Sequence, residues 1–233
     1  MARRDEEPAK VRRLRMMIAA GLGGAALLIV AVGLFFVFRP VGEIDSGAHY
    51  ELLAGAERPR EGDVVVTEYF SYGCVHCSNF DPQIEAWQAD LPEGVRFERV
   101  PVAFSPAWRA LSAAYFAAEE LDILERNHTR LFDAIHRTQL PLSTPEALAQ
   151  FFDGHGTDAE TFRREMNSPA VRRALEAAAE QATVDEIRAV PTIVVDRRYR
   201  ISGGELSRSQ VLDVADELIA RELSERAGGA GAG

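Results

Sequence analysis

The chain has 233 residues, of which 47% are hydrophobic, and its formal net charge at pH 7 is −10. This length accommodates one domain of about 150–190 residues with additional segments, and the apolar fraction is sufficient for a buried core. Because no basic stripe accompanies the acidic net charge, a nucleic-acid-binding function is not expected.

The first 38 residues have the pattern of a membrane anchor. Residues 1–15 contain six basic and three acidic side chains, which predicts a cytoplasmic segment. Residues 16–38 carry no charge; as a helix they extend about 34 Å, compared with about 30 Å for the hydrocarbon core of a bilayer. A cleavable signal peptide usually has a shorter apolar region of about 7–15 residues, although small residues inside the run leave cleavage open. We expect a single-pass helix in the cytoplasmic membrane, with the remainder of the chain periplasmic or otherwise extracytoplasmic.

A tether and the first half of a sheet domain follow. Residues 39–61 mix polar residues with Gly and Pro and are predicted to be a tether with one short strand near His49–Leu53. Residues 64–70 are β-branched and aromatic, as is typical of a strand. A helix is predicted to begin at the first cysteine, with a kink at the proline inside it. A second strand is predicted for residues 95–104.

The second half of the chain begins with helical patterns. Four helices are predicted between residues 105 and 184, with a cap for the third at Ser143 or Thr144. Two short strands and a closing helix follow. This order indicates an α/β domain, residues 62–104 and 184–226, interrupted by a helical insertion at 105–183. Residues 227–233 are predicted to be a disordered tail.

Both cysteines of the chain lie in the stretch FSYGCVHCSNF, as Cys74 and Cys77. A disulfide between them would close a very small loop and add little stability, so the spacing favours chemistry. At a helix N-terminus, unpaired N–H groups and the helix dipole stabilise a thiolate. We therefore predict Cys74 as an exposed nucleophile of low pKa and Cys77 as a shielded resolving thiol. His76 can add a donor or a positive charge.

Other uses of these cysteines are less consistent with the sequence. Haem attachment needs a histidine directly after the second cysteine, and Ser78 stands there. Structural zinc needs four ligands, and Cys74, His76 and Cys77 leave one missing. An inert pair remains an alternative. We expect no cofactor or metal beyond the redox-active disulfide itself. His128 and His136 are expected to pack at the surface or half-buried, His155 to lie in a loop, and Trp87 and Trp108 to pack in the core.

At EYFSYGCVHC the sequence resembles the DsbA-type thiol:disulfide oxidoreductases of the bacterial cell envelope, over about residues 48–225. The resemblance implies a thioredoxin-like fold with an inserted helical domain, here preceded by a single N-terminal transmembrane helix. This family is itself the standard example of an acidic cysteine and an oxidising disulfide, so the low pKa expected at Cys74 is not independent of it.

Further positions match the family pattern. Glu68 lies six residues before Cys74, where the family carries a buried acid that assists proton transfer at the inner cysteine, and Arg99 matches a basic position on the next strand. From the residues alone, a solvent-facing Glu68 and a plain surface Arg99 stay open. The resemblance also implies a cis peptide bond before Pro191, opposite the dithiol.

The resemblance assigns substrate binding to residues beside the dithiol. Val190 would pair with an extended substrate strand next to Pro191, and Val75 would contact the substrate beside Cys74. The family's usual dipeptide between the cysteines is Pro-His, and here it is Val75-His76. This departure leaves the redox potential open.

These features predict a membrane-tethered oxidoreductase that introduces disulfides into reduced exported proteins. The resemblance implies that a quinone-linked membrane partner reoxidises it. One alternative is a reductase or isomerase with the same fold. Another is a non-catalytic anchored binding module or chaperone in which the cysteines are incidental. A monomer is expected.

Overall fold

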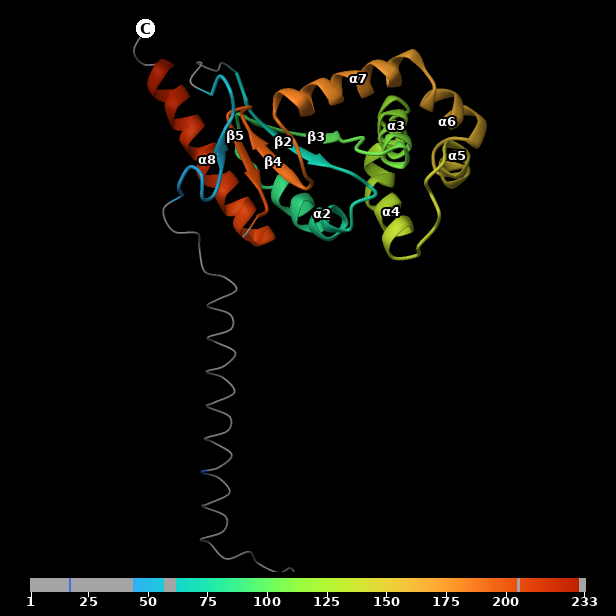
Figure 1. Ribbon diagram of the computed structural model, residues 1–233, viewed down its shortest axis with the longest axis horizontal. Coiled ribbons are helices and arrows are strands. Elements are labelled where there is room, and N and C mark those ends of the chain that lie inside the picture. Colours follow the sequence, from blue (N-terminus) through green and yellow to red (C-terminus); the bar gives the residue numbers. More distant parts are fainter. Residues whose placement is uncertain (1–16, 18–43, 57–61, 205, 231–233) are drawn as a thin grey trace, which may run out of the picture. The chain divides into compact units, whose positions relative to one another are not determined.

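The computed structural model describes residue 17 and residues 44–56, 62–204 and 206–230. Apart from residue 17, these ranges belong to one compact unit, Gly42–Gly233 (Figure 1). Among the described residues, no helix is both long and apolar enough to cross a bilayer. The basic segment, nearly all of the predicted anchor and the two ends of the predicted tether lie outside the described residues.

A five-stranded mixed sheet forms the centre of the sheet domain. In spatial order the strands are β1, β5, β4, β2 and β3. β2 runs parallel to β3 and antiparallel to β4, and β5 pairs antiparallel with both β4 and β1. The bounds are Glu51–Leu52 for β1, Val64–Phe70 for β2, Val95–Pro101 for β3, Thr192–Val195 for β4 and Tyr199–Ser202 for β5.

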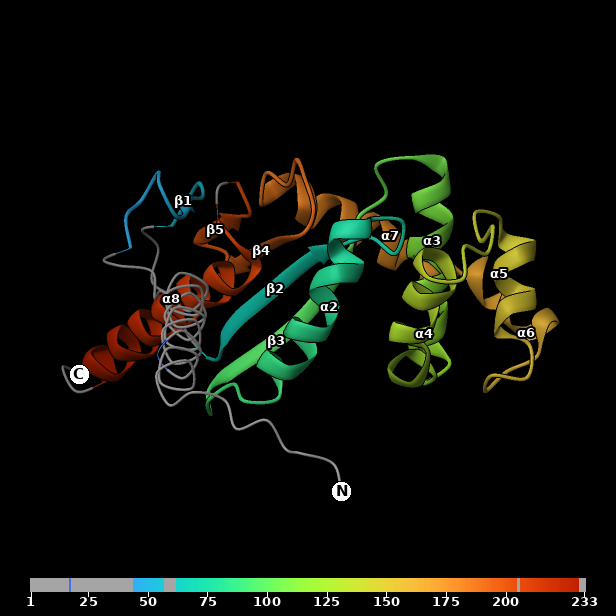
Figure 2. The same ribbon diagram turned by 90° about the horizontal axis from the view of Figure 1, so that it is seen from below.

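Strand β2, which lies between β4 and β3, is covered on both faces. Helices α2 (Val75–Gln88) and α8 (Arg208–Ala230) lie on one face of the sheet, in front of it in Figure 2, and α7 (Pro169–Val184) lies on the other. Every residue of β2 except Val65 is therefore buried. A strand covered on both faces has no solvent-facing side, so Glu68 in β2 is buried with its apolar neighbours.

The helical insertion consists of α3 (Pro106–Glu120), α4 (Leu124–His136), α5 (Pro145–Phe152) and α6 (Ala159–Met166), and α7 returns the chain to the sheet. Side-chain caps start α3, α5, α6 and α7, because in each helix an oxygen of the preceding residue accepts the N–H of the third helical residue. The cap of α5 is Thr144. α6 was not predicted from the sequence.

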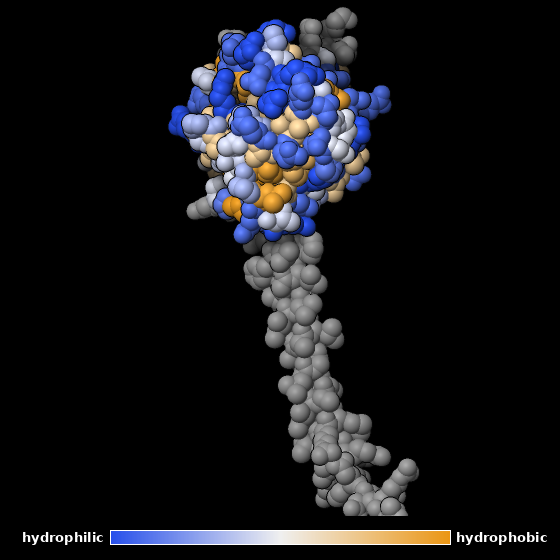
Figure 3. Space-filling model, turned by 90° about the vertical axis from the view of Figure 1, so that its right-hand side faces the viewer, coloured by the Kyte–Doolittle hydropathy of each residue, from blue (hydrophilic) through white to orange (hydrophobic). Residues whose placement is uncertain are grey.

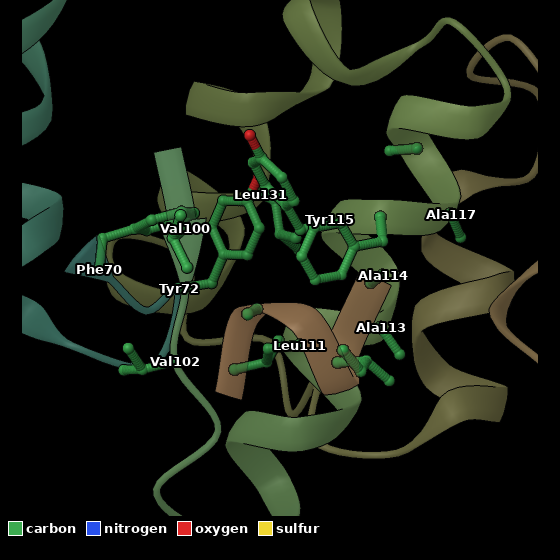
Figure 4. Packing of buried hydrophobic residues seen from close by; sticks show 14 of the residues in the cluster. Phe70, Tyr72, Val100, Val102, Leu111, Ala113, Ala114, Tyr115, Ala117 and Leu131 are labelled. Carbon is green, nitrogen blue, oxygen red and sulfur yellow. The ribbon is translucent and has the colours of Figure 1, made fainter. Parts of the chain in front are cut away.

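One aromatic cluster joins the sheet to the insertion. Phe70 and Tyr72 reach out from the end of β2 and pack against Tyr115 of α3 and Phe132 of α4 (Figure 4). The insertion thus shares a continuous core with the residues that precede Cys74. The outer end of the insertion, near α5 and α6, is mostly hydrophilic with a small apolar area (Figure 3).

Three details differ from the sequence predictions. β3 ends at Pro101, before the predicted limit at residue 104. α8 continues to Ala230, into the segment predicted as a disordered tail, because extending an existing helix adds a hydrogen bond for each residue fixed. The two tryptophans are half-buried, since each packs at the edge of the core: Trp87 donates to Asp216 (2.7 Å) and Trp108 stacks on Phe104.

Candidate active site

Cys74 occupies the N-cap of α2, as the sequence predicted for the start of this helix. Its backbone is extended, and its Sγ accepts the backbone N–H of Cys77 at 3.4 Å. The first turn of α2 contains no acidic residue, so nothing there opposes a negative charge on the sulfur. Both cysteines are free thiols in this structure. The helix N-terminus therefore presents donors and its positive dipole end to one sulfur.

The two thiols have pKa shifts of opposite sign. The pKa of Cys74 is lowered to about 6, first because the Cys77 thiol donates a hydrogen bond to its sulfur. Burial opposes this shift, and the backbone N–H groups and charge of the first turn support it. The same hydrogen bond, followed by burial, raises the pKa of Cys77 well above its usual value. The first proton lost by the pair therefore leaves Cys74.

The accessibility of the pair differs in part from the prediction. Cys77 is fully buried, as expected of a shielded thiol, but Cys74 is only 8% exposed instead of open to solvent. The reason is that neighbouring groups cover it, with the indole of Trp108 over Gly73 and the Val190 carbonyl against its sulfur. The exposed part of the motif is Val75, at 51%, together with His76.

The peptide bond between Val190 and Pro191 is cis, which confirms the prediction. The carbonyl oxygen of Val190 lies 3.6 Å from Cys74 Sγ. Pro191 directly precedes β4, and the Thr192 hydroxyl donates to the Ala189 carbonyl at 2.9 Å across this turn. The fold thereby brings the Val190 carbonyl to the sulfur of a residue 116 positions earlier in the chain.

Glu68 and Arg99 form a buried ion pair beneath the dithiol. They face each other in the parallel register of β2 and β3, and Arg99 Nε lies 2.8 Å from Glu68 Oε2. Burial raises the pKa of Glu68, and the charge of Arg99 limits the rise. Glu68 in turn contributes to the raised pKa of Cys77. Arg99 is thus no surface arginine; its side chain is only 12% exposed.

The same guanidinium also contacts α2. Arg99 Nη2 lies 2.9 Å from Glu85 and 3.7 Å from Asp81. With His128, these two carboxylates place ligand atoms within 4.8 Å of one another. The guanidinium of Arg99 forms ion pairs with both carboxylates, so the three side chains belong to one network of opposite charges.

Sequence reasoning missed three residues near the dithiol. Trp108 lies against Gly73, and Phe104, which is 51% exposed, stacks on it with ring centroids 5.9 Å apart. Tyr72, two residues before Cys74, is buried in the aromatic cluster. The sequence held no signal for Trp108 and Phe104, because their proximity to Cys74 depends on how α3 and the residues before it pack. Tyr72 stood inside the motif and could have been considered.

Comparison with known proteins identifies the family of this chain. The family described as a DSBA-like thioredoxin domain matches residues 65–208. A protein named thiol:disulfide interchange protein DsbA from Azotobacter vinelandii is 35% identical over 212 residues, which cover 90% of this chain and 98% of that protein. The crystal structure of Pseudomonas aeruginosa DsbA is 33% identical with a TM-score of 0.73, covering 78% of this chain and 96% of that one. An oxidoreductase DsbA from Xylella fastidiosa is similar to the same degree, with a TM-score of 0.73.

Proposed function

This chain belongs to the DsbA-like family of thioredoxin-fold proteins and is a protein thiol:disulfide oxidoreductase, and from that premise we propose that it introduces disulfides into exported proteins while anchored in the cytoplasmic membrane. The family resemblance predicted from EYFSYGCVHC is thereby confirmed. The direction of electron flow, the site roles and the anchoring are the parts that we propose.

One observation carries the proposed chemistry: the ionisable sulfur of Cys74 lies at the N-terminus of α2, against the Val190 carbonyl. Its pKa of about 6 leaves it mostly ionised at neutral pH. A stabilised thiolate favours the reduced form of the pair, and this makes the corresponding disulfide a better oxidant. The site therefore suits an enzyme that oxidises substrate thiols to disulfides and is itself reduced.

The proposed reaction is two thiol–disulfide exchanges. A substrate thiolate attacks Cys74 Sγ in the Cys74–Cys77 disulfide, and Cys77 leaves as a thiolate and is protonated. A second substrate thiolate then attacks the substrate sulfur of the mixed disulfide and releases Cys74 as a thiolate. The substrate loses two electrons and gains a disulfide, while the enzyme disulfide becomes a dithiol. No additional cofactor takes part.

We assign the proton transfer at Cys77 to the buried pair Glu68 and Arg99. The raised pKa of Glu68 suits a group that exchanges a proton with a neighbouring buried thiol. The raised pKa of Cys77 means that it takes up a proton on leaving. Between proton transfers, the charge of Arg99 stabilises the ionised carboxylate of Glu68 in its buried position.

The substrate would bind along Val190 and Pro191, beside the dithiol. A substrate strand can hydrogen-bond to the backbone of Val190, in the manner of strand addition to a sheet edge. Val75, next to Cys74 in the chain, and Phe104, which stacks on Trp108, are each 51% exposed and offer apolar contact. Reduced and incompletely folded proteins expose apolar side chains, and these contacts suit them.

The location and partners rest on the sequence. An uncharged run at residues 16–38 after a basic segment favours a single-pass anchor with the catalytic domain in the periplasm. Reoxidation requires an acceptor for two electrons, and a quinone-linked membrane protein would supply it. We propose that the chain acts as a monomer.

Trapping of substrates tests the proposal. In a Cys77→Ala variant, the Cys74 thiolate can attack a disulfide of an exported protein, which forms a mixed disulfide and releases one thiolate of that protein. Because no Cys77 thiolate is present to attack Cys74 Sγ and expel the bound protein, these mixed disulfides should accumulate. These adducts should disappear on reduction and should be absent from a Cys74→Ala/Cys77→Ala control. If no adducts form in cells that export disulfide-containing proteins, the proposed oxidase function is wrong.

The redox potential decides the direction. The wild-type protein equilibrated with glutathione should be more oxidising than the glutathione couple, in keeping with the stabilised Cys74 thiolate. A potential near that of thioredoxin, about −270 mV, would instead indicate a reductase. Activity that persists after both cysteines are replaced by serine would indicate a chaperone.

A further inference from the structure

We propose that His128 and His136 of α4 are positioning residues for the nucleophile: together they fix Tyr72, and through it the backbone that presents Cys74. This inference rests on the proposed function, because it concerns the same sulfur. It gives the helical insertion a role in setting the reactivity of the dithiol, in addition to covering the sheet.

The side chain of Tyr72 ends in a buried hydrogen-bond chain. Its Oη lies 2.7 Å from His128 Nδ1, and His128 Nε2 lies 3.0 Å from Asp81 Oδ1. A carboxylate only accepts, so His128 donates through Nε2 to Asp81. The Thr129 hydroxyl also donates to Asp81, at 3.2 Å. Each member of this chain is therefore oriented by the next, from α2 through α4 to the residue two positions before Cys74.

The backbone of Tyr72 is held from the same helix. His136, two turns after His128, lies with Nε2 2.8 Å from the Tyr72 carbonyl oxygen and donates to it. The two histidines are eight residues apart, so they lie on one face of α4. One binds the hydroxyl and the other binds the carbonyl of a single residue, which restricts both its side chain and its peptide plane.

The turn between Tyr72 and Cys74 transmits this restriction. The Cys74 N–H donates to the Ser71 carbonyl at 3.0 Å, and the Gly73 N–H donates to Ser71 Oγ at 3.1 Å. Trp108 of α3 closes the turn from outside by packing on Gly73. With Tyr72 fixed on α4, the Cys74 sulfur is held where the Cys77 N–H reaches it.

Packing alone does not explain these groups. The rings of Phe70, Phe132 and Tyr115 surround Tyr72 and His128, so apolar side chains would fill the same space. A hydroxyl and an imidazole buried there are costly unless their hydrogen bonds form with defined geometry. That geometry is the property that positions a neighbouring reactive group.

The test measures the ionisation of Cys74 in the full-length reduced protein. Tyr72→Phe removes one oxygen and keeps the ring, and His136→Leu removes the donor to the carbonyl. Each should raise the pKa of Cys74, followed by thiolate absorbance, by about half a unit to one unit. The equilibrium constant for reduction by glutathione should fall by about three- to tenfold.

Two further variants separate positioning from general stability. Tyr115→Phe removes another hydroxyl from the same cluster. This hydroxyl donates to the Arg99 carbonyl at 3.4 Å, whereas His128 and His136 bond to the hydroxyl and the carbonyl of Tyr72. It should leave the pKa of Cys74 unchanged even if it lowers the melting temperature. His136→Gln keeps an N–H donor and should restore most of the shift caused by His136→Leu.

The outcomes are decisive. The proposal is wrong if the Tyr72→Phe and His136→Leu variants fold but keep the wild-type pKa of Cys74. It is also wrong if their pKa shifts are no larger than the shift in Tyr115→Phe. Should Tyr72→Phe fail to fold, the comparison of His136→Leu with His136→Gln decides. His136 is half-buried and is the last residue of α4, so both substitutions should be tolerated. Because the readout is a pKa and not oxidase activity, an error in the proposed direction of electron flow would leave this result interpretable.

Discussion

At the scale of single residues, a proton is distributed unequally between two sulfurs one helical turn apart. Cys74 receives the Cys77 thiol hydrogen bond and the backbone N–H of the first turn. Cys77 is fully buried and gives a hydrogen bond, and these two effects outweigh the backbone hydrogen bond at Ser71 that would stabilise its thiolate. This asymmetry assigns attack to one sulfur and leaving to the other.

We predict that Cys77→Ala raises the pKa of Cys74 more than His76→Ala does. Cys77 donates directly to the sulfur, whereas His76 is exposed and acts across solvent, which screens its charge. The rate of alkylation of the wild-type protein should be half-maximal at about pH 6 and should fall below it, as the thiolate is protonated. The midpoint should move upward in both variants. A larger shift in His76→Ala would show that charge, and not the thiol hydrogen bond, controls the site.

The sequence predicted those residues whose chemistry is local. Cys74 and Cys77 could be assigned from their spacing, because both belong to one helical turn. Tyr72 could not be given its role, since its partner His128 is 56 positions away and only the packing of α4 brings the two together. The expectation of an exposed Cys74 was wrong for the same reason: what covers it comes from Trp108 and Val190.

At the scale of elements, Arg99 connects two strands and a helix beneath the dithiol. It projects from β3, pairs with Glu68 of β2 and reaches Glu85 of α2. A buried ion pair of this kind adds little net stability compared with an apolar pair, but removing one partner leaves an uncompensated charge. The pair therefore constrains which substitutions the site tolerates.

We predict that Arg99→Met lowers the free energy of unfolding by about 3–5 kcal/mol. Adding Glu68→Gln should recover part of this loss, because no buried charge then remains at that position. The matched control is Arg96→Met, on the same strand. The Arg96 side chain is 55% exposed and pairs with Glu98, so its loss should lower the free energy of unfolding by less than about 1 kcal/mol. Urea unfolding of the reduced proteins measures all three.

The pH dependence of the Arg99→Met loss follows from Glu68. Burial already raises the pKa of Glu68 above its unfolded value, and removing Arg99 should raise it further. A raised carboxyl pKa contributes stability below the unfolded pKa, and that contribution is lost as pH rises through the folded pKa. The variant should thus be closer to wild type at pH 4 than at pH 7. An equal loss at both values would mean that Glu68 is not the group left uncompensated.

We predict that Gly73→Ala disturbs the contact between the insertion and the nucleophile turn. A Cβ at this position would lie 2.8 Å from Trp108 Cδ1, too close for a rigid, half-buried indole, so ring or turn must move. Overpacking of this kind costs about 1–3 kcal/mol. Thermal unfolding should show this loss, and Gly73→Ala/Trp108→Leu should recover part of it. Recovery would fail if the strain lay in the backbone of the turn.

Element types were easier to predict than their ends. Val64–Phe70 could be predicted because β-branched and aromatic residues dominate it, and its limits agree with the structure. α6 was missed because its N-cap, Asp158, directly follows a loop rich in glycine. The two-sided burial of β2 could not be predicted, since it depends on helices from both ends of the chain.

At the scale of the whole molecule, the insertion shares one core with part of the sheet domain. The cluster that contains Phe70 and Tyr72 continues through α3 and α4 to α5, α6 and α7. The order of elements predicted an insertion but not this continuity, because periodicity shows which face of a helix is apolar and not what covers it. An insertion so closely packed on the nucleophile turn is part of the catalytic unit.

The last prediction concerns how the catalytic unit is held in the cell. If residues 16–38 form an uncleaved anchor, the full-length chain should remain with membranes after carbonate extraction. A chain beginning at residue 42, the start of the compact unit, should be released when exported through a cleavable signal. Both should have the same redox potential, since the residues around Cys74 all lie within that unit. If cells that express the full-length chain instead yield a soluble periplasmic protein that lacks its N-terminal residues, the apolar run is removed as a signal peptide. In that case the reoxidising partner must be met by diffusion, and the attack on exported chains would not be confined to the membrane surface.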